Sequence, residues 1–308
     1  MVKYSHNLIK KGVQAMEIRA YAKINLLLDI LGKTDDDYHS IFMIMQSIGI
    51  YDEVTVELEG RANQINLTCS NPALPTDKSN IAHKAAKAFF DYYNKQGLNP
   101  SKTNPGIKIH IEKNIPFAAG LAGGSADAAA VIFGLNEILN AGLTTEELCA
   151  IGVKVGADVP FCIKGGTMVA LDIGQVLAPL PPIKDKYIVL VKPDQSVSTK
   201  EAYDAFDTAS NIRHCNTSAM VHALANNLDF CPYVQNVFEQ FVEVPDRVEI
   251  KSVLRAYNAK ATCMSGTGPS VYGIFDNETK ARSCANALRD KFKNTFFITP
   301  VNKGLEIL

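Results

Sequence analysis

The sequence has almost no net charge, since 31 lysines and arginines face 32 aspartates and glutamates among its 308 residues. No overall field therefore draws the chain onto nucleic acid or an anionic membrane. Long apolar runs are missing too, and stretches such as 126–135 are far shorter than the roughly 20 residues that a membrane-spanning helix needs. The first fifteen residues lack the pattern of a secretory signal. We expect a cytoplasmic protein that binds neither nucleic acid nor membrane.

Patterns for metal ligands and disulfides are also missing. The seven cysteines are odd in number and widely spread, and no two of them form a C-x-x-C pair. The histidines form no H-E-x-x-H pair. This distribution is typical of reduced thiols in the cytosol rather than of a disulfide framework or a zinc site. We therefore expect no tightly held structural metal.

Hydrophobic residues make up 47% of the chain, enough to bury one large domain or two of ordinary size. Residues 17–31 alternate strictly between apolar and other side chains, which predicts a long strand with one buried face. Lys23 and Asn25 share the opposite face, where they can point together into a cleft. An ordinary solvated strand face would give the same pattern.

The remaining periodicities predict an α+β protein of two domains. The first domain, 16–180, contains strands at 52–58, 65–69 and 107–112, a helix at 80–93, and a helix with a capping box at Thr144 and Glu147 that Gly156 can end. Prolines at 179, 181 and 182 indicate a boundary. The second domain, 181–308, has strands at 187–192, near the SGTG turn and at 296–301, with helices at 247–257 and 278–291. That order is typical of a ferredoxin-like α+β sandwich. We expect residues 1–15 to be a disordered extension.

A glycine-rich loop leads into an apolar helix at Gly120, Gly123, Gly124 and Ser125. Bare backbone N–H groups at a helix N-terminus form a cradle for anions such as nucleotide phosphates. Neither G-x-x-x-x-G-K-[ST] nor G-x-G-x-x-G is present, which excludes the common P-loop and the Rossmann fingerprint. A helix start packed closely on a sheet would also use glycine, but Ser125 favours phosphate or a magnesium ion.

Asp158 follows a glycine in the sequence GADVPF, among apolar neighbours. A carboxylate there is either a local backbone cap or a catalytic group. A nearby ammonium such as Lys23 would keep it ionised. Gly266 and Gly268 form a second glycine turn between two apolar strands, which a tight turn alone would explain.

Three segments together resemble the three signature motifs of the GHMP kinases, in order and spacing. They are residues 22–26 with Tyr38 and His39 downstream, the loop 116–126, and the turn SGTGPSVYGIF. More narrowly, AKIN, the tyrosine–histidine pair followed by Gln46, and GADVPF resemble the members that phosphorylate a cytidine-diphosphate-linked methylerythritol. The resemblance covers the chain from about residue 17 to its end, and implies an N-terminal ATP-binding domain and a C-terminal substrate domain.

The resemblance implies transfer of the ATP γ-phosphate, with Mg²⁺, to the tertiary 2-hydroxyl of 4-diphosphocytidyl-2-C-methyl-D-erythritol, in non-mevalonate isoprenoid synthesis. Asp158 takes the place of the aspartate that accepts the hydroxyl proton, and Lys23 that of the lysine beside it. Asn25 would reach the polyol, and His39 and Tyr203, with Tyr38 beside them, would clamp the cytosine. The implied ATP contacts are Pro116, Gly120, Leu121, Gly123, Gly124, Ser125 and Ala126, with Asn80 and Lys113 near the adenine. Ser125 is also the magnesium candidate, and Thr199, Gly266 and Thr267 are candidate substrate or phosphate contacts.

The sequence departs from this pattern before Tyr38, where Asp37 replaces the usual glycine. Glycine takes positive φ without strain, so the position of this loop is in question. Two alternatives remain open: another GHMP kinase, of the homoserine or mevalonate type, and a catalytically inactive ligand sensor. The presence of both Lys23 and Asp158 favours an active kinase. A monomer and a weak homodimer fit the sequence equally well.

Overall fold

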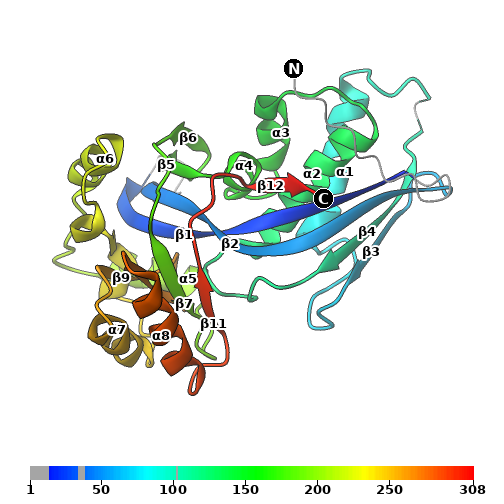
Figure 1. Ribbon diagram of the computed structural model, residues 1–308. Coiled ribbons are helices and arrows are strands. Elements are labelled where there is room, and N and C mark those ends of the chain that lie inside the picture. The colour runs from blue at the N-terminus through cyan, green and yellow to red at the C-terminus, as the bar shows by residue number, and fades with distance from the viewer. Residues whose placement is uncertain (1–13, 34–38, 102) are drawn as a thin grey trace.

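The computed structural model describes residues 14–33, 39–101 and 103–308, and Figure 1 shows two lobes connected by the long strands β1 (Ala15–Lys33) and β2 (His39–Glu59). The predictions for residues 1–13, for Asp37 and for Tyr38 lie outside the described part. Ala15, which we expected to end a disordered extension, instead begins β1 and pairs with Glu57 of β2. None of the helices in the described part is long and apolar enough to cross a membrane.

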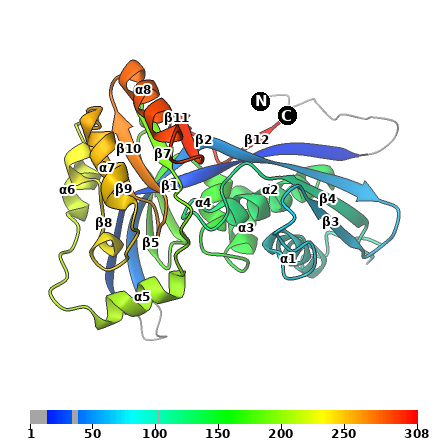
Figure 2. The same ribbon diagram turned by 90° about the horizontal axis from the view of Figure 1, so that it is seen from below.

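The first sheet runs in the order β12 (Leu305–Ile307), β1, β2, β4 (Gly106–Glu112), β3 (Ile65–Cys69). β5 (Thr167–Asp172) pairs with β2 and with β6 (Val176–Pro179), and β8 (Gln235–Asn236) pairs with β1. Four helices lie on one side of it (Figure 2): α1 (Ile81–Lys95), α2 (Gly123–Ile138), α3 (Thr145–Gly152) and α4 (Val159–Lys164). The apolar helix α2 packs directly on β1 and β2, with α1 against it.

β1 is buried on both faces, so the prediction of a single buried face is wrong. Every residue from Ala20 to Ile30 is buried. One cause is packing from two sides, because α2 contacts the strand and so does η2 (Val237–Gln240) of the second lobe. The other is irregular pairing with β2 after Tyr21, Asn25 and Ile30, which resets the alternation.

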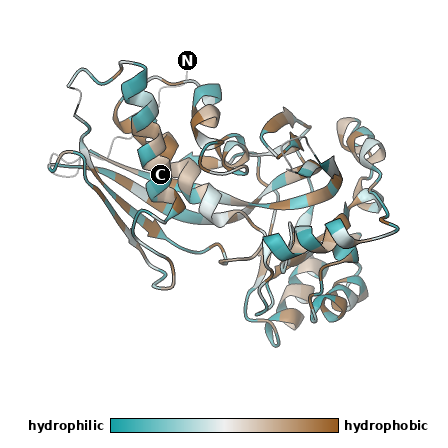
Figure 3. Ribbon diagram, turned by 180° about the vertical axis from the view of Figure 1, so that it is seen from behind, coloured by the Kyte–Doolittle hydropathy of each residue, from teal (hydrophilic) through white to brown (hydrophobic). Residues whose placement is uncertain are grey.

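The second lobe is an antiparallel sheet in the order β11 (Thr295–Ile298), β7 (Tyr187–Val191), β10 (Val271–Phe275), β9 (Ala261–Met264). The helices α7 (Arg247–Ala256) and α8 (Glu278–Arg289) pack on it around a separate apolar core, which completes the ferredoxin-like order strand–helix–strand–strand–helix–strand. In Figure 3 the helices of this lobe carry both teal and brown turns, as expected for helices with one buried face. Between β7 and α7 lie α5 (Thr199–Thr208), α6 (Thr217–Ala225) and η1 (Cys231–Tyr233).

The element boundaries were largely predicted, with three exceptions. The capping box at Thr144 and Glu147 is present, but α3 ends at Gly152 rather than Gly156. The first half of β2, the short helix α4 and the short strands β5, β6, β8 and β12 were not predicted. The boundary at residue 180 falls between β6 and β7, yet β8 and β12 join the first sheet from beyond it. The domain limits therefore stay a prediction.

Candidate active site

A cavity of about 320 Å³ lies where β1, the loop before α2, the start of α5 and the β9–β10 turn meet. Nine of the residues predicted from sequence line it: Lys23, Asn25, Gly120, Ser125, Asp158, Thr199, Tyr203, Gly266 and Thr267. They come from five separate segments of the chain, so the fold brings together side chains that the sequence keeps far apart.

Lys23 is the buried cation of this cavity, with 4% of its surface exposed. Its Nζ donates a hydrogen bond to Asn25 Oδ1 at 2.7 Å and lies 3.6 Å from Asp158 Oδ2. The amide of Asn25 also donates to the sulfur of Met43 at 3.1 Å. The two residues of β1 thus point together into the cavity, as predicted.

Asp158 occupies the N-cap position of α4, but its carboxylate accepts no capping hydrogen bond. Its side chain is 29% exposed and faces the Lys23 ammonium. The local-cap explanation therefore does not account for this carboxylate. The Lys23 ammonium 3.6 Å away offsets the negative charge of this carboxylate, and a carboxylate without a capping bond can accept a proton.

The N-terminus of α2 is open to a ligand. Ala122, in the left-handed region at φ 58°, is the N-cap and makes no side-chain cap. Gly124 is exposed and Ser125 lines the cavity, whereas the Ala126 N–H is already bonded to Ala122 O. Bare N–H groups at a helix start suit an anion.

Of the other loop residues, Leu121 accepts a hydrogen bond at its carbonyl oxygen from the Lys23 N–H, at 3.1 Å. Five of the predicted ATP contacts do not line the cavity: Pro116, Leu121, Gly123, Gly124 and Ala126. Leu121 and Ala126 are buried.

The two glycine turns meet backbone to backbone. A Cβ on Gly120 (φ +73°) would lie 2.3 Å from the carbonyl oxygen of Ser265, and one on Gly266 would lie 3.3 Å from Gly120. Gly123 and Gly124 would instead meet Ile115 and Ile81 side chains, so close packing also explains their small size.

The buried Ser265 hydroxyl ties these turns to β1. It donates to Gly120 O at 2.9 Å and accepts from Asn25 N at 3.2 Å. From the same strand pair, Tyr272 donates its hydroxyl to Asn25 O at 2.8 Å. Asn236 donates its amide to Met264 O and Gly266 O, at 2.8 and 2.7 Å. The second lobe therefore positions both the glycine loop and the strand that carries Lys23.

Asn80 and Lys113 do not line the cavity. Asn80 caps α1, where Oδ1 accepts from Ala82 N at 2.8 Å and Nδ2 donates to Pro75 O at 2.6 Å.

Lys113 Nζ lies between two buried carboxylates, Asp52 at 2.5 Å and Asp127 at 2.7 Å. Burial acts to lower the pKa of Lys113, but Asp127 and Asp52 raise it on balance, so the ammonium stays charged. The cluster fixes the strand–loop junction ahead of the glycine loop. Contact of either Asn80 or Lys113 with adenine stays a prediction.

Tyr203 and Phe238 line one end of the cavity, and His39, which is not among the lining residues, packs on Tyr203. The His39 and Tyr203 centroids are 4.6 Å apart with 38° between the planes, and Phe206 and Phe238 pack edge-on against them. Burial and the nearby Asp158 charge raise the pKa of Tyr203 to about 12, so its hydroxyl stays protonated. Rings whose centroids lie 4.6 Å apart are already in contact with each other, so the predicted clamp requires them to part before a base can stack between them.

Several residues of the site were missed. Ile41 and Met43 line the cavity, and Asp207 bonds to His39. Ile41 and Met43 alternate with His39 along a strand, and Asp207 lies four residues after Tyr203 on a helix, so both could have been found by spacing. No group of three or more possible metal ligands is found among the described residues.

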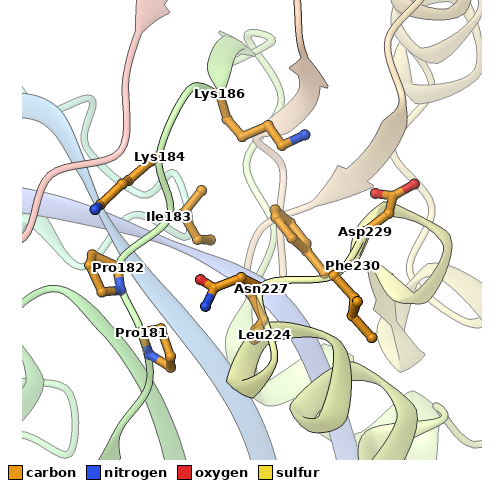
Figure 4. Close-up of a pocket in the computed structure, with 10 residues that line it drawn as sticks. Pro181, Pro182, Ile183, Lys184, Lys186, Leu224, Asn227, Asp229 and Phe230 are labelled. Atoms are coloured by element: carbon orange, nitrogen blue, oxygen red, sulfur yellow. The ribbon is translucent and has the colours of Figure 1, made fainter.

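A second cavity, of about 340 Å³, lies between the linker 181–186 and the segment 224–230 (Figure 4). Its walls combine apolar residues such as Pro181 and Phe230 with polar ones, and its Lys186 is paired with Asp276. None of the predicted site residues lies there.

Residues 80–166 match the family described as GHMP kinases N terminal domain, and residues 212–294 match GHMP kinases C terminal. A protein of Clostridium botulinum (strain Alaska E43 / Type E3), named 4-diphosphocytidyl-2-C-methyl-D-erythritol kinase, is 44% identical over 285 residues, 91% of this chain and 98% of the relative. A protein of that name from Clostridium acetobutylicum is 41% identical over 289 residues, 92% and 99% of the two chains.

Solved structures agree on the fold. A crystal structure of 4-(cytidine 5'-diphospho)-2C-methyl-D-erythritol kinase superposes with a TM-score of 0.73 at 29% identity, covering 92% of this chain and 99% of the other. Homoserine kinase from Cytophaga hutchinsonii gives 0.76 at 17% identity, covering both chains fully, a likeness of fold alone.

Proposed function

The chain belongs to the GHMP kinases, and on that premise we propose that it transfers the γ-phosphoryl group of ATP to the 2-hydroxyl of 4-diphosphocytidyl-2-C-methyl-D-erythritol. The products are the 2-phosphate and ADP, and the reaction serves non-mevalonate isoprenoid synthesis. The observation that carries this proposal is the 44% identity to a kinase of that name over 98% of its length. The Lys23–Asp158 pair inside the cavity supplies the chemistry.

Asp158 is the proposed general base. Its carboxylate is uncapped and ion-paired, so it can accept the proton of the attacking hydroxyl. Lys23 lies 3.6 Å from that carboxylate and would stabilise the negative charge that develops on the transferred group. Because phosphoryl transfer needs little covalent help, the protein's main contributions are in-line positioning and charge stabilisation.

The start of α2 is the proposed phosphate site, because its N–H groups have no side-chain cap. Mg²⁺ suits a site like this one, with the Ser125 hydroxyl and nucleotide phosphates as ligands, because this ion is commonly held through substrate phosphates rather than an all-protein cage. When bound, it neutralises charge on those phosphates. Of the predicted ATP contacts, Pro116, Leu121 and Ala126 act by shaping the loop.

Asn25, between Lys23 and the aromatic end, is the proposed polyol contact, and Thr199 and Thr267 approach each other to 3.4 Å across the same cavity. His39 and Tyr203 supply the proposed cytosine site, where stacking on flat side chains is worth about 1–3 kcal/mol per base. We place the enzyme in the cytoplasm, in keeping with seven free cysteines, as a monomer or weak homodimer.

The test is ADP release with ATP and Mg²⁺ on the cytidine compound, beside mevalonate, homoserine and galactose. We expect turnover with the cytidine compound alone, and a fall in kcat of about 10²–10⁴-fold in Asp158→Asn with little change in the KM for ATP. The matched control is Asp204→Asn, which removes an exposed carboxylate on α5.

Turnover with another alcohol would support the assignment as a kinase and contradict the proposed cytosine site. No turnover with any of the four, while ligands still bind, would instead favour a sensor.

A further inference from the structure

One wall of the cavity is apolar and adjoins Asp158. On β2, Ile41 and Met43 occupy alternate positions, so they share a face, and both line the cavity. β5 pairs with this stretch of β2, which brings the turn that follows β5 next to the same two residues. Ala157, the residue before Asp158, lines the cavity as well.

The side chains of Ile41, Met43 and Ala157 converge at Gly174, in the turn after β5. Gly174 is buried, and a Cβ built on it would lie 3.1 Å from Met43 Cε, 3.8 Å from Ile41 Cδ1 and 4.0 Å from Ala157 Cβ. The three carbons are therefore neighbours, although they belong to distant segments of the chain. We call Ile41, Met43 and Ala157 the apolar wall.

Met43 connects the apolar wall to the reacting groups. Its sulfur accepts a hydrogen bond from Asn25 Nδ2 at 3.1 Å, and Asn25 Oδ1 accepts one from Lys23 Nζ at 2.7 Å. Lys23 Nζ in turn lies 3.6 Å from Asp158 Oδ2. A carbon whose hydroxyl faces Asp158 therefore has polar groups on one side, and hydrocarbon from Met43 and Ala157 close by.

We propose that the apolar wall selects a substrate in which the carbon that bears the reacting hydroxyl also bears a methyl group, so that Ile41 and Met43 are specificity-determining residues. This inference rests on the proposed function, whose substrate is a tertiary alcohol of that kind. A methyl group against the wall buries apolar surface on both partners. Hydrogen in its place would leave a void or a poorly bonded water against hydrocarbon, which costs free energy.

The test compares kcat/KM for the 2-C-methyl substrate with kcat/KM for an analogue in which hydrogen replaces that methyl group. A carbon that fits an apolar pocket is worth about 10-fold or more, and Ile41→Ala and Met43→Ala each remove part of the wall. We therefore expect each variant to lower the methyl-to-hydrogen ratio about three- to tenfold. The intrinsic difference between a tertiary and a secondary hydroxyl is the same for every variant, so it cancels in this comparison.

Two variants are matched controls. Phe42→Ala changes the residue between Ile41 and Met43, whose side chain lines a different cavity beside α6, and it should keep the wild-type ratio. Met43→Leu removes the sulfur that accepts from Asn25 but keeps the apolar volume, so it should also keep the ratio even where kcat changes.

A further measurement looks for a gain rather than a loss. Met43→Ala opens space in the wall, so it should raise kcat/KM for a 2-C-ethyl analogue relative to the 2-C-methyl substrate, a change that a poorly folded variant would not produce.

Methyl-to-hydrogen ratios within twofold of wild type in both alanine variants would overturn the inference and leave the proposed function standing, because the cytidine compound would still be phosphorylated. A wild type that phosphorylates neither compound would remove both.

Discussion

The buried cluster of Lys113, Asp52 and Asp127 contains two carboxylates but one ammonium, and its two acids are not equivalent. Asp52 accepts from Lys113 and from the N–H groups of Asn114 and Ile115, at 2.6 and 2.8 Å. Asp127 accepts from Lys113 at 2.7 Å, and within the described residues its Oδ1 has no partner. Removing one acid should therefore differ greatly from removing the other.

We predict that Asp127→Asn changes the free energy of unfolding by no more than about 1 kcal/mol at neutral pH, because the amide oxygen still accepts from Lys113 and one excess buried charge is gone. Asp52→Asn should cost about 3–5 kcal/mol, since it weakens a buried ion pair and its NH₂ group must face either the Lys113 ammonium at Oδ2 or the two N–H donors at Oδ1. Lys113→Met should cost at least as much, because two carboxylates then remain without a cation.

The same cluster predicts a pH dependence with a definite sign. Burial raises the pKa of Asp127 well above its usual value; Lys113 acts to lower it and Asp52 to raise it. An acid whose pKa is higher in the folded state contributes stability that is complete below the unfolded pKa, about 3.9, and is lost as pH rises through the folded pKa. Wild type should therefore lose stability relative to Asp127→Asn as pH rises from about 4.

Urea unfolding at several pH values, followed by circular dichroism, measures both effects through the midpoint and the slope. Equal, large losses in Asp127→Asn and Asp52→Asn at neutral pH would refute the reasoning. So would an advantage of the wild type that grows with pH.

Three further variants test the cavity. Gly120→Ala should lower the free energy of unfolding by about 1–2 kcal/mol because its backbone is left-handed, and by more because the new Cβ would lie 2.3 Å from the Ser265 carbonyl oxygen. Gly97→Ala is the control, because Gly97 has φ +70° and nothing within 4 Å of a Cβ, so urea unfolding of this variant should show the backbone contribution alone. Lys23→Met should lower kcat about 10²–10³-fold without unfolding the chain, and a kcat within twofold of wild type would exclude its role. Asn236→Asp replaces two donated hydrogen bonds by repulsion between a carboxylate and the carbonyl oxygens of Met264 and Gly266, which should lower the free energy of unfolding by about 1–3 kcal/mol. We also expect steady-state kinetics to show a higher KM for both substrates.

Local pattern was enough to predict most elements and the face shared by Lys23 and Asn25. It could not predict that β1 is buried on both sides, because this depends on α2 and η2, which arrive from distant parts of the chain. It also missed β12, whose three residues are too few to show an alternation.

The candidate site was predictable where a residue lies in a recognisable motif, and less so where it does not. Asp158 was assigned through the resemblance of GADVPF and the loop through its glycines, whereas no motif includes Asp207, which only the fold brings to His39. Asn80 and Lys113 were assigned through resemblance, and their side chains already have partners in the protein.

The pairing of β12 with β1 has a consequence for how the chain is made. Leu308 N bonds to Glu17 O, so one edge of the first sheet is covered by residues synthesised nearly 290 positions later. Contacts this distant are slow to form, and until they do β1 presents unpaired backbone to any other strand. We expect the first lobe to reach its final state only after the second lobe has left the ribosome, so that the lobe carrying Lys23 is completed last.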